Sequence, residues 1–191
     1  GLAGVKSVMS ETDAKLFLDL KLHDIPNTVA GAATAIAAAK PDFLTVHAAG
    51  GTAMISAAVN ALPSVNITAV TILTSLSNSD VSAIGFTSDA LTSAVGLAQL
   101  ATTAGARAIV CSPLEVSAIR SQLGQTPIVI TPGVRPLCDQ GSDDQKRTMT
   151  PKDAISSGAT YVVIGRPITG AWSQGASAMR DKARSVADEI L

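Results

Sequence analysis

The sequence predicts an α/β protein in which a parallel sheet is covered by helices. Short apolar runs alternate with longer Ala-rich stretches along the 191 residues, which is the rhythm of successive strand and helix units. The runs are rich in Val, Ile, Leu and Thr with little alternation, as expected of strands buried on both faces. Several of the stretches between them end at Gly or Pro, which interrupt helices.

Six strands and six helices are expected in alternation. The apolar runs predict strands over residues 16–21, 43–47, 67–73, 107–111, 127–131 and 160–165. The stretches between and after them predict helices over residues 26–39, 51–62, 90–104, 113–123, 151–157 and 175–191. The first of these helices begins at Pro26, since Pro fits the first turn, and ends before Pro41.

The length favours a particular closed sheet. A (β/α)8 TIM barrel takes roughly 250 residues, or about 31 for each strand and helix unit, so this chain holds about six units. An open doubly wound sheet is the alternative. The barrel fits better because the chain starts without a strand of its own, as if two units preceded it. We therefore expect a single, incomplete TIM-barrel domain over residues 1–191, with about six of the eight units present.

Composition excludes several classes of function. The net charge is −1 and aromatic residues make up 3% of the chain, which disfavours binding to nucleic acid or to an anionic membrane. Charged residues make up only 15%, against roughly 25% in average soluble domains, so we expect another surface to cover part of this one. Cys111 and Cys138 are far apart and predict neither a zinc cluster nor a disulfide framework. Without an apolar leader or span, a cytoplasmic protein is expected.

The most informative segment is DLKLHDIPNT, residues 19–28. In a strand, Asp19 and Lys21 point to the same side, while Leu18 and Leu20 point to the other, toward the helices. The pair stands at the C-terminal end of its strand, where barrel active sites are built, and Asp24 follows in the loop. A structural ion pair is the alternative reading of a lone D-x-K. Two carboxylates and a Lys in a chain so poor in charge favour a functional site.

This segment resembles the signature of the orotidine 5'-phosphate decarboxylases, which remove CO2 from orotidine monophosphate to give UMP. Later segments resemble that family's blocks in the family's order: VHAAGG (46–51), VTILTS (70–75), TPGVRP (131–136), DQKRTMTP (144–151) and VIGRPIT (163–169). The resemblance implies the TIM barrel and an enzyme of pyrimidine biosynthesis that uses no cofactor.

The resemblance also implies roles for the first group of site residues. Lys21 would donate the proton to C6, and Asp19 would lie beside the substrate carboxylate. Asp24 would complete the charged network in the neighbouring subunit's site of a homodimer. Ile25 and Thr28 belong to the same shared segment and are expected to contact the substrate.

A second group is expected to bind the rest of the nucleotide. Barrels often bind phosphate with the loops after the last two strands and a short helix N-terminus, which here points to Gly165 and Arg166. The guanidinium fork suits bidentate contact with phosphate. The resemblance adds Arg135 and Gln145, from the long loop after residue 131, and assigns Thr74 to the pyrimidine.

Other candidates receive no catalytic role. His23 and His47 each stand at a strand end, where a hydrogen-bonded structural His is the more common outcome. No phosphate-binding or dinucleotide-binding glycine pattern occurs between a strand and a helix, so neither ATP, NAD nor a metal ion is expected.

Two alternatives remain open at the level of sequence. One is a Mg²⁺-dependent phosphosugar decarboxylase of the same barrel superfamily, and the other is a remnant that binds a phosphate ligand without catalysis. The family has a ribose-binding Asp on its first strand and a further Lys on its second, and neither has a counterpart here. Lys6 does not fit that Lys, because the segment after it does not read as a strand. We therefore expect this chain to be part of a longer polypeptide.

Overall fold

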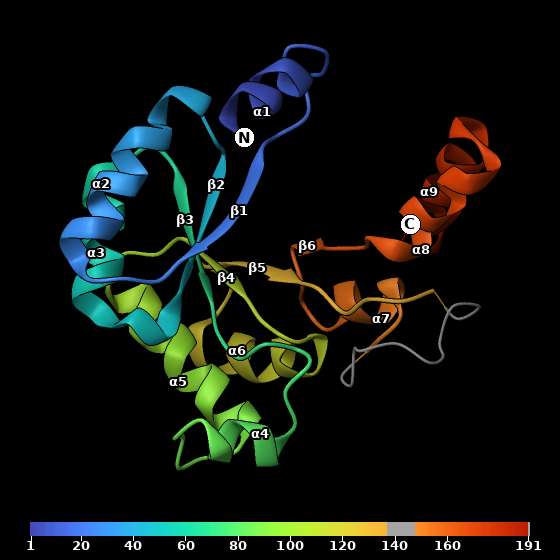
Figure 1. Cartoon of the computed structure of the whole chain (residues 1–191). Helices are drawn as coiled ribbons and strands as arrows, with labels where there is room; N and C mark the ends of the chain where they lie inside the picture. The colour runs from blue at the N-terminus through green and yellow to red at the C-terminus, as the bar shows by residue number, and fades with distance from the viewer. Residues whose placement is uncertain (137–147, 191) are drawn as a thin grey trace. The chain divides into compact units, whose positions relative to one another are not determined.

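The computed structural model describes residues 1–136 and 148–190 (Figure 1). The chain divides into two compact units, each described here by itself. The first unit contains Gly1–Thr71 and Gly96–Ile109, and the second contains Ile72–Val95 and Val110–Leu191. The single domain expected over residues 1–191 stays a prediction.

The described strands hydrogen-bond in chain order, from β1 to β6. They are β1 (Phe17–Leu22), β2 (Phe43–His47), β3 (Asn66–Val70), β4 (Ala108–Val110), β5 (Ile128–Thr131) and β6 (Tyr161–Val162). The pairs β1–β2, β2–β3 and β5–β6 are parallel. The α/β class with a parallel sheet is confirmed, and each of the six predicted apolar runs overlaps a strand.

Helices follow the strands as the alternation predicts. The α-helices are α1 (Leu2–Met9), α2 (Pro26–Ile36), α3 (Gly51–Ala61), α4 (Asn78–Ala83), α5 (Ala90–Thr103), α6 (Val116–Leu123), α7 (Pro151–Ser156), α8 (Arg166–Thr169) and α9 (Ala176–Ile190). The 3-10 helices are η1 (Ala37–Ala39), η2 (Ala48–Gly50), η3 (Pro113–Glu115) and η5 (Gly170–Gln174). No helix of the described chain is both long and apolar enough to cross a membrane.

In the first unit, α2 and α3 pack side by side against the strands (Figure 1). The helix α2 starts at Pro26, after an extended Ile25, as Pro at the first helical position favours. Its buried residues, Val29, Ala33 and Ile36, are spaced four and three apart and therefore share one face. The first four residues of β2 are all buried, so this strand lies at the centre of the unit's core.

In the second unit, Arg120 of α6 connects that helix by hydrogen bonds to the segments just before β5 and β6. Its guanidinium donates hydrogen bonds to the carbonyl oxygens of Gly158 at 2.9 Å and Pro127 at 2.7 Å, and to Thr160 Oγ1 at 3.1 Å. Gly158 has a φ of 109°, and a Cβ there would lie 3.0 Å from Arg120 Cγ. A side chain larger than Gly would therefore push against the arginine. These bonds fix where β5 and β6 begin.

Some boundaries differ from the prediction. The strand expected over residues 67–73 ends at Val70, and that expected over residues 160–165 ends at Val162. The helices α1 and α4 were not predicted. The start of α4 has a readable signal, since Ser77 and Asp80 form a reciprocal capping box. The helix α1 buries none of its residues, so its apolar positions give a weaker signal.

We predict that Arg120→Leu lowers the free energy of unfolding by roughly 2 kcal/mol or more, because several acceptors lose a charged donor. The matched control is Arg107→Leu, since Arg107 donates one exposed hydrogen bond, to the Pro63 carbonyl at 2.7 Å. This control should cost less than about 1 kcal/mol. Urea denaturation measures both values, and equal losses would contradict the role of Arg120.

Candidate active site

The predicted ion pair at the C-terminal end of β1 is present. The Lys21 ammonium donates to Asp19 Oδ2 at 2.6 Å, and the two side chains are 41% and 44% exposed. Partial exposure of both side chains leaves room for a ligand beside them. The geometry provides a cation and an anion, in contact, at the open end of a strand.

The strand that carries this pair is not regular. Leu18 and Leu22 of β1 pair with Leu44 and Val46 of β2. The two β1 residues are four positions apart and their partners are two positions apart, so β1 has two extra residues, which form a bulge. Lys21 has a φ of 50°, in the left-handed region. Leu20, expected to point toward the helices, is 45% exposed, so it is not buried under them. Alternation applies to regular strands, and the bulge interrupts it.

Thr45 of β2 lies opposite the bulge and is fully buried. Its Oγ1 accepts a hydrogen bond from the Lys21 backbone N–H at 2.8 Å and donates one to Asp19 Oδ1 at 2.8 Å. Sequence reasoning missed this residue. The signal that could have found it is a hydroxyl in the middle of the run FLTVH, whose other residues before the strand end are apolar.

Asp24, Ile25 and Thr28 follow β1 and are all exposed. The Asp24 carboxylate accepts a hydrogen bond from the Ile25 N–H at 2.7 Å, which fixes the entry to α2. Ile25 is 66% exposed. Thr28 lies in the first turn of α2. The segment thus presents an acid, an apolar group and a hydroxyl to its surroundings.

The two histidines lie against each other beside the ion pair. The ring centroids of His23 and His47 are 5.3 Å apart. Burial lowers the pKa of His47 below its ordinary value of 6.5, and the charges of His23 and Lys21 lower that pKa further, while Asp19 opposes them. His47 therefore stays neutral over a wider pH range and adds no second positive charge near Lys21. The structural role expected of both rings stays a prediction.

The remaining predicted site residues belong to the second unit. Thr74 is nearly buried, at 7% exposed, and lies in a turn four residues beyond the end of β3. Thr74 was expected at the end of a longer strand, but the strand ends earlier and the turn holds this residue instead. Gly165 is the N-cap of α8, and Arg166 is the first residue of that helix and is exposed.

Arg135 was expected near the phosphate, and it is 7% exposed. Its backbone N–H donates to the Met149 carbonyl at 2.9 Å, and its Nη1 donates to the Val134 carbonyl at 3.3 Å. A buried guanidinium is held in place rather than freely solvated. Gln145 and Cys138 lie outside the described residues.

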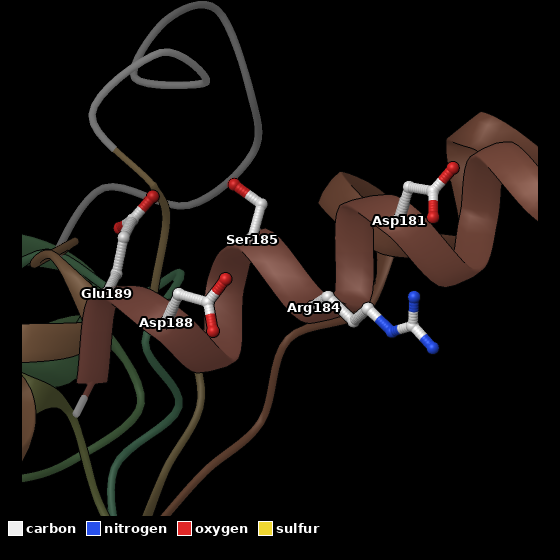
Figure 2. A pocket seen from close by; sticks show the side chains of 5 residues that line it. All are labelled: Asp181, Arg184, Ser185, Asp188 and Glu189. Atoms are coloured by element: carbon white, nitrogen blue, oxygen red, sulfur yellow. The ribbon is translucent and has the colours of Figure 1, made fainter.

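One further hollow runs along α9. Figure 2 shows its lining, which comes entirely from that helix: Asp181, Arg184, Ser185, Asp188 and Glu189. None of these residues was predicted to be functional. Within the described chain, no three His, Cys, Asp or Glu side chains are grouped so that they could hold a metal ion.

Comparison with known proteins decides the family. The sequence profile of the "Orotidine 5'-phosphate decarboxylase / HUMPS family" matches residues 2–180. The chain belongs to this family. The orotidine 5'-phosphate decarboxylase of Thermobifida fusca is 51% identical over 178 residues, covering 93% of this chain and 76% of the relative. That of Frankia casuarinae is 50% identical, covering 93% of this chain and 65% of the relative.

Solved structures of the orotidine 5'-phosphate decarboxylase family resemble this one. The crystal structure of the enzyme from Lactobacillus acidophilus has a TM-score of 0.83 and 34% identity, covering all of this chain and 81% of that one. The enzyme from Pyrococcus horikoshii, with a TM-score of 0.73 and 24% identity, shares the fold. The resemblance read from DLKLHDIPNT and the later blocks is therefore confirmed at the level of the family. The roles of single residues stay predictions.

Proposed function

We propose that the protein converts orotidine 5'-phosphate to UMP, as a step of pyrimidine biosynthesis and without a cofactor. The observation that carries the proposal is the ion pair of Asp19 and Lys21 at the C-terminal end of β1, in a chain of this decarboxylase family. The site would belong to a cytoplasmic (β/α)8 barrel, of which this chain supplies six strands. The likeness to the Lactobacillus acidophilus enzyme supports the barrel.

The chemistry requires a cation beside C6 of the pyrimidine. Loss of CO2 breaks the bond between C6 and the carboxylate and leaves an electron pair on C6, with no neighbouring carbonyl to delocalise it. The Lys21 ammonium would stabilise this charge, because a preoriented cation is most effective where negative charge develops. It would then transfer a proton to C6, and the neutral amine would regain a proton from water.

Asp19 would act on the group that leaves. In this proposal its carboxylate, which contacts Lys21 at 2.6 Å, would lie beside the substrate carboxylate. Two carboxylates in proximity repel each other, and departure of CO2 relieves this repulsion. The binding energy of distant parts of the substrate offsets the cost of bringing the two together.

The phosphate would supply much of that binding energy. In our proposal the Arg166 guanidinium and the backbone N–H of Gly165 contact the phosphate, with Arg135 and Gln145 in its surroundings and Thr74 at the pyrimidine. The exposure of Arg166 at the start of α8 supports this assignment. The burial of Arg135 favours a fixed position for its charge.

The working unit would be a homodimer with shared active sites. The low charged fraction of 15% and the exposed Ile25 support a surface that a second subunit covers. In this arrangement Asp24, Ile25 and Thr28 would reach the substrate of the neighbouring subunit.

We predict that Lys21→Ala abolishes decarboxylation of orotidine 5'-phosphate and leaves UMP binding detectable, because UMP needs neither proton transfer nor charge stabilisation. Loss of orotate absorbance measures turnover in protein from the full reading frame. Lys15→Ala, an exposed lysine just before β1, is the matched control and should keep its activity. Lys21→Ala activity within about tenfold of the wild type would refute the role. Loss of wild-type turnover in a chelator would favour the Mg²⁺-dependent alternative.

We predict that Arg166→Ala weakens binding of UMP by roughly 10- to 150-fold and leaves uridine binding nearly unchanged, since a charged hydrogen bond to phosphate contributes about 1.5–3 kcal/mol. Calorimetry on both ligands gives the comparison. Equal losses for nucleotide and nucleoside would remove Arg166 from the phosphate site.

We predict that activity reappears when inactive Asp24→Asn and Lys21→Ala subunits are mixed and re-equilibrated. With shared sites, a mixed dimer has one site with both lesions and one with neither, so up to about half of the wild-type activity returns. If Asp24 serves its own subunit, every site keeps one lesion and nothing returns. Native mass spectrometry confirms that mixed dimers form.

A further inference from the structure

The buried hydroxyl of Thr45 connects the two charged residues of the site. Thr45 is fully buried in β2, next to the bulge of β1. Its Oγ1 accepts the Lys21 N–H and donates to Asp19 Oδ1, both at 2.8 Å, while Lys21 Nζ donates to Asp19 Oδ2 at 2.6 Å. The two carboxylate oxygens of Asp19 therefore have different partners, and one of these partners also holds the Lys21 backbone.

The Lys21 backbone needs such a partner. The left-handed region is unfavourable for residues with a Cβ, and Lys21 occupies it with a φ of 50°. The bulge also takes its N–H out of the regular ladder between β1 and β2. The N–H points at the fully buried Thr45, whose hydroxyl accepts its hydrogen bond and so satisfies it.

We infer that Thr45 is a positioning residue for decarboxylation, an inference that rests on the proposed function. It orients the Asp19 carboxylate through Oδ1 and holds the backbone of Lys21, so the ammonium meets the reacting carbon in one arrangement. Small errors in the position of a reacting group reduce the rate of the chemical step more than they reduce binding. Thr45 contacts neither end of the substrate in this proposal and acts only through Asp19 and Lys21.

The decisive variants are Thr45→Val and Thr45→Ser. Val has nearly the shape of Thr but can neither accept from Lys21 nor donate to Asp19, whereas Ser keeps the hydroxyl. The matched control is Thr68→Val, because Thr68 is the register partner of Thr45 in β3 and is also fully buried. Its hydroxyl donates to the Asn66 carbonyl at 2.9 Å, away from the ion pair.

We expect Thr45→Val to lower kcat by about tenfold or more, since one donor and one acceptor next to the reacting groups are lost. KM for orotidine 5'-phosphate and the dissociation constant of UMP should stay within about threefold of the wild type. Thr45→Ser and Thr68→Val should keep kcat within about threefold. If Thr45→Val does not fold, Thr45→Ala carries the same comparison.

Hydrogen exchange of the Lys21 amide gives a second readout that does not depend on turnover. It should be slow in the wild type and in Thr45→Ser, and markedly faster in Thr45→Val. An active wild type with an unchanged kcat in Thr45→Val would overturn the inference and leave the proposed function intact. A wild type that binds UMP but does not decarboxylate would overturn the proposed function instead, while the exchange result would still decide what Thr45 holds.

Discussion

A bulge of two residues in β1 is the constraint on which the candidate site depends. It places Lys21 in the left-handed region and turns its N–H toward Thr45, while the side chains of Asp19 and Lys21 meet at 2.6 Å. A regular strand would pair this N–H in the ladder and alternate the side chains between the two faces. The bulge therefore interrupts the regular pairing of β1 with β2 and brings two opposite charges into contact at the strand end.

The surrounding first unit supports that exchange. The strand β2 is buried along its first four residues and provides a firm partner for the irregular strand. The helix α2 begins at Pro26, four residues after the bulge ends at Leu22. Just before it, the Ile25 N–H donates a hydrogen bond to the Asp24 carboxylate. Local stability on both sides of the bulge lets a strained residue persist between them.

Much of this arrangement could be predicted from the sequence. The apolar runs locate all six strands, and Pro26 with Pro41 brackets the first long helix together with η1. The D-x-K spacing at a strand end predicts the ion pair. The bulge could not be predicted, because strand periodicity assumes one residue for each step of the ladder. The role of Thr45 depends on register across two strands, which a single run of residues does not contain.

The surroundings of the arginines in the second unit could not be predicted from residue type. Arg120 donates mainly to backbone carbonyls just before β5 and β6, whereas Arg135 is buried. Residue type predicts the charge, whereas the acceptors that surround it come only from the fold. Arg166, by contrast, keeps the exposure that a ligand contact needs.

In our proposal, an ammonium group at position 21 carries the reaction. The most direct test is to replace Lys21 by Cys and then alkylate the thiol with 2-bromoethylamine, which restores an ammonium at nearly the same distance from the backbone. Lys21→Ala treated in the same way controls for reaction at Cys111 and Cys138. We expect the Lys21→Cys protein to be inactive and to regain a large part of the wild-type kcat after alkylation, with no gain in Lys21→Ala. If mass spectrometry shows complete alkylation and kcat does not rise, the proposed role of the Lys21 ammonium is contradicted.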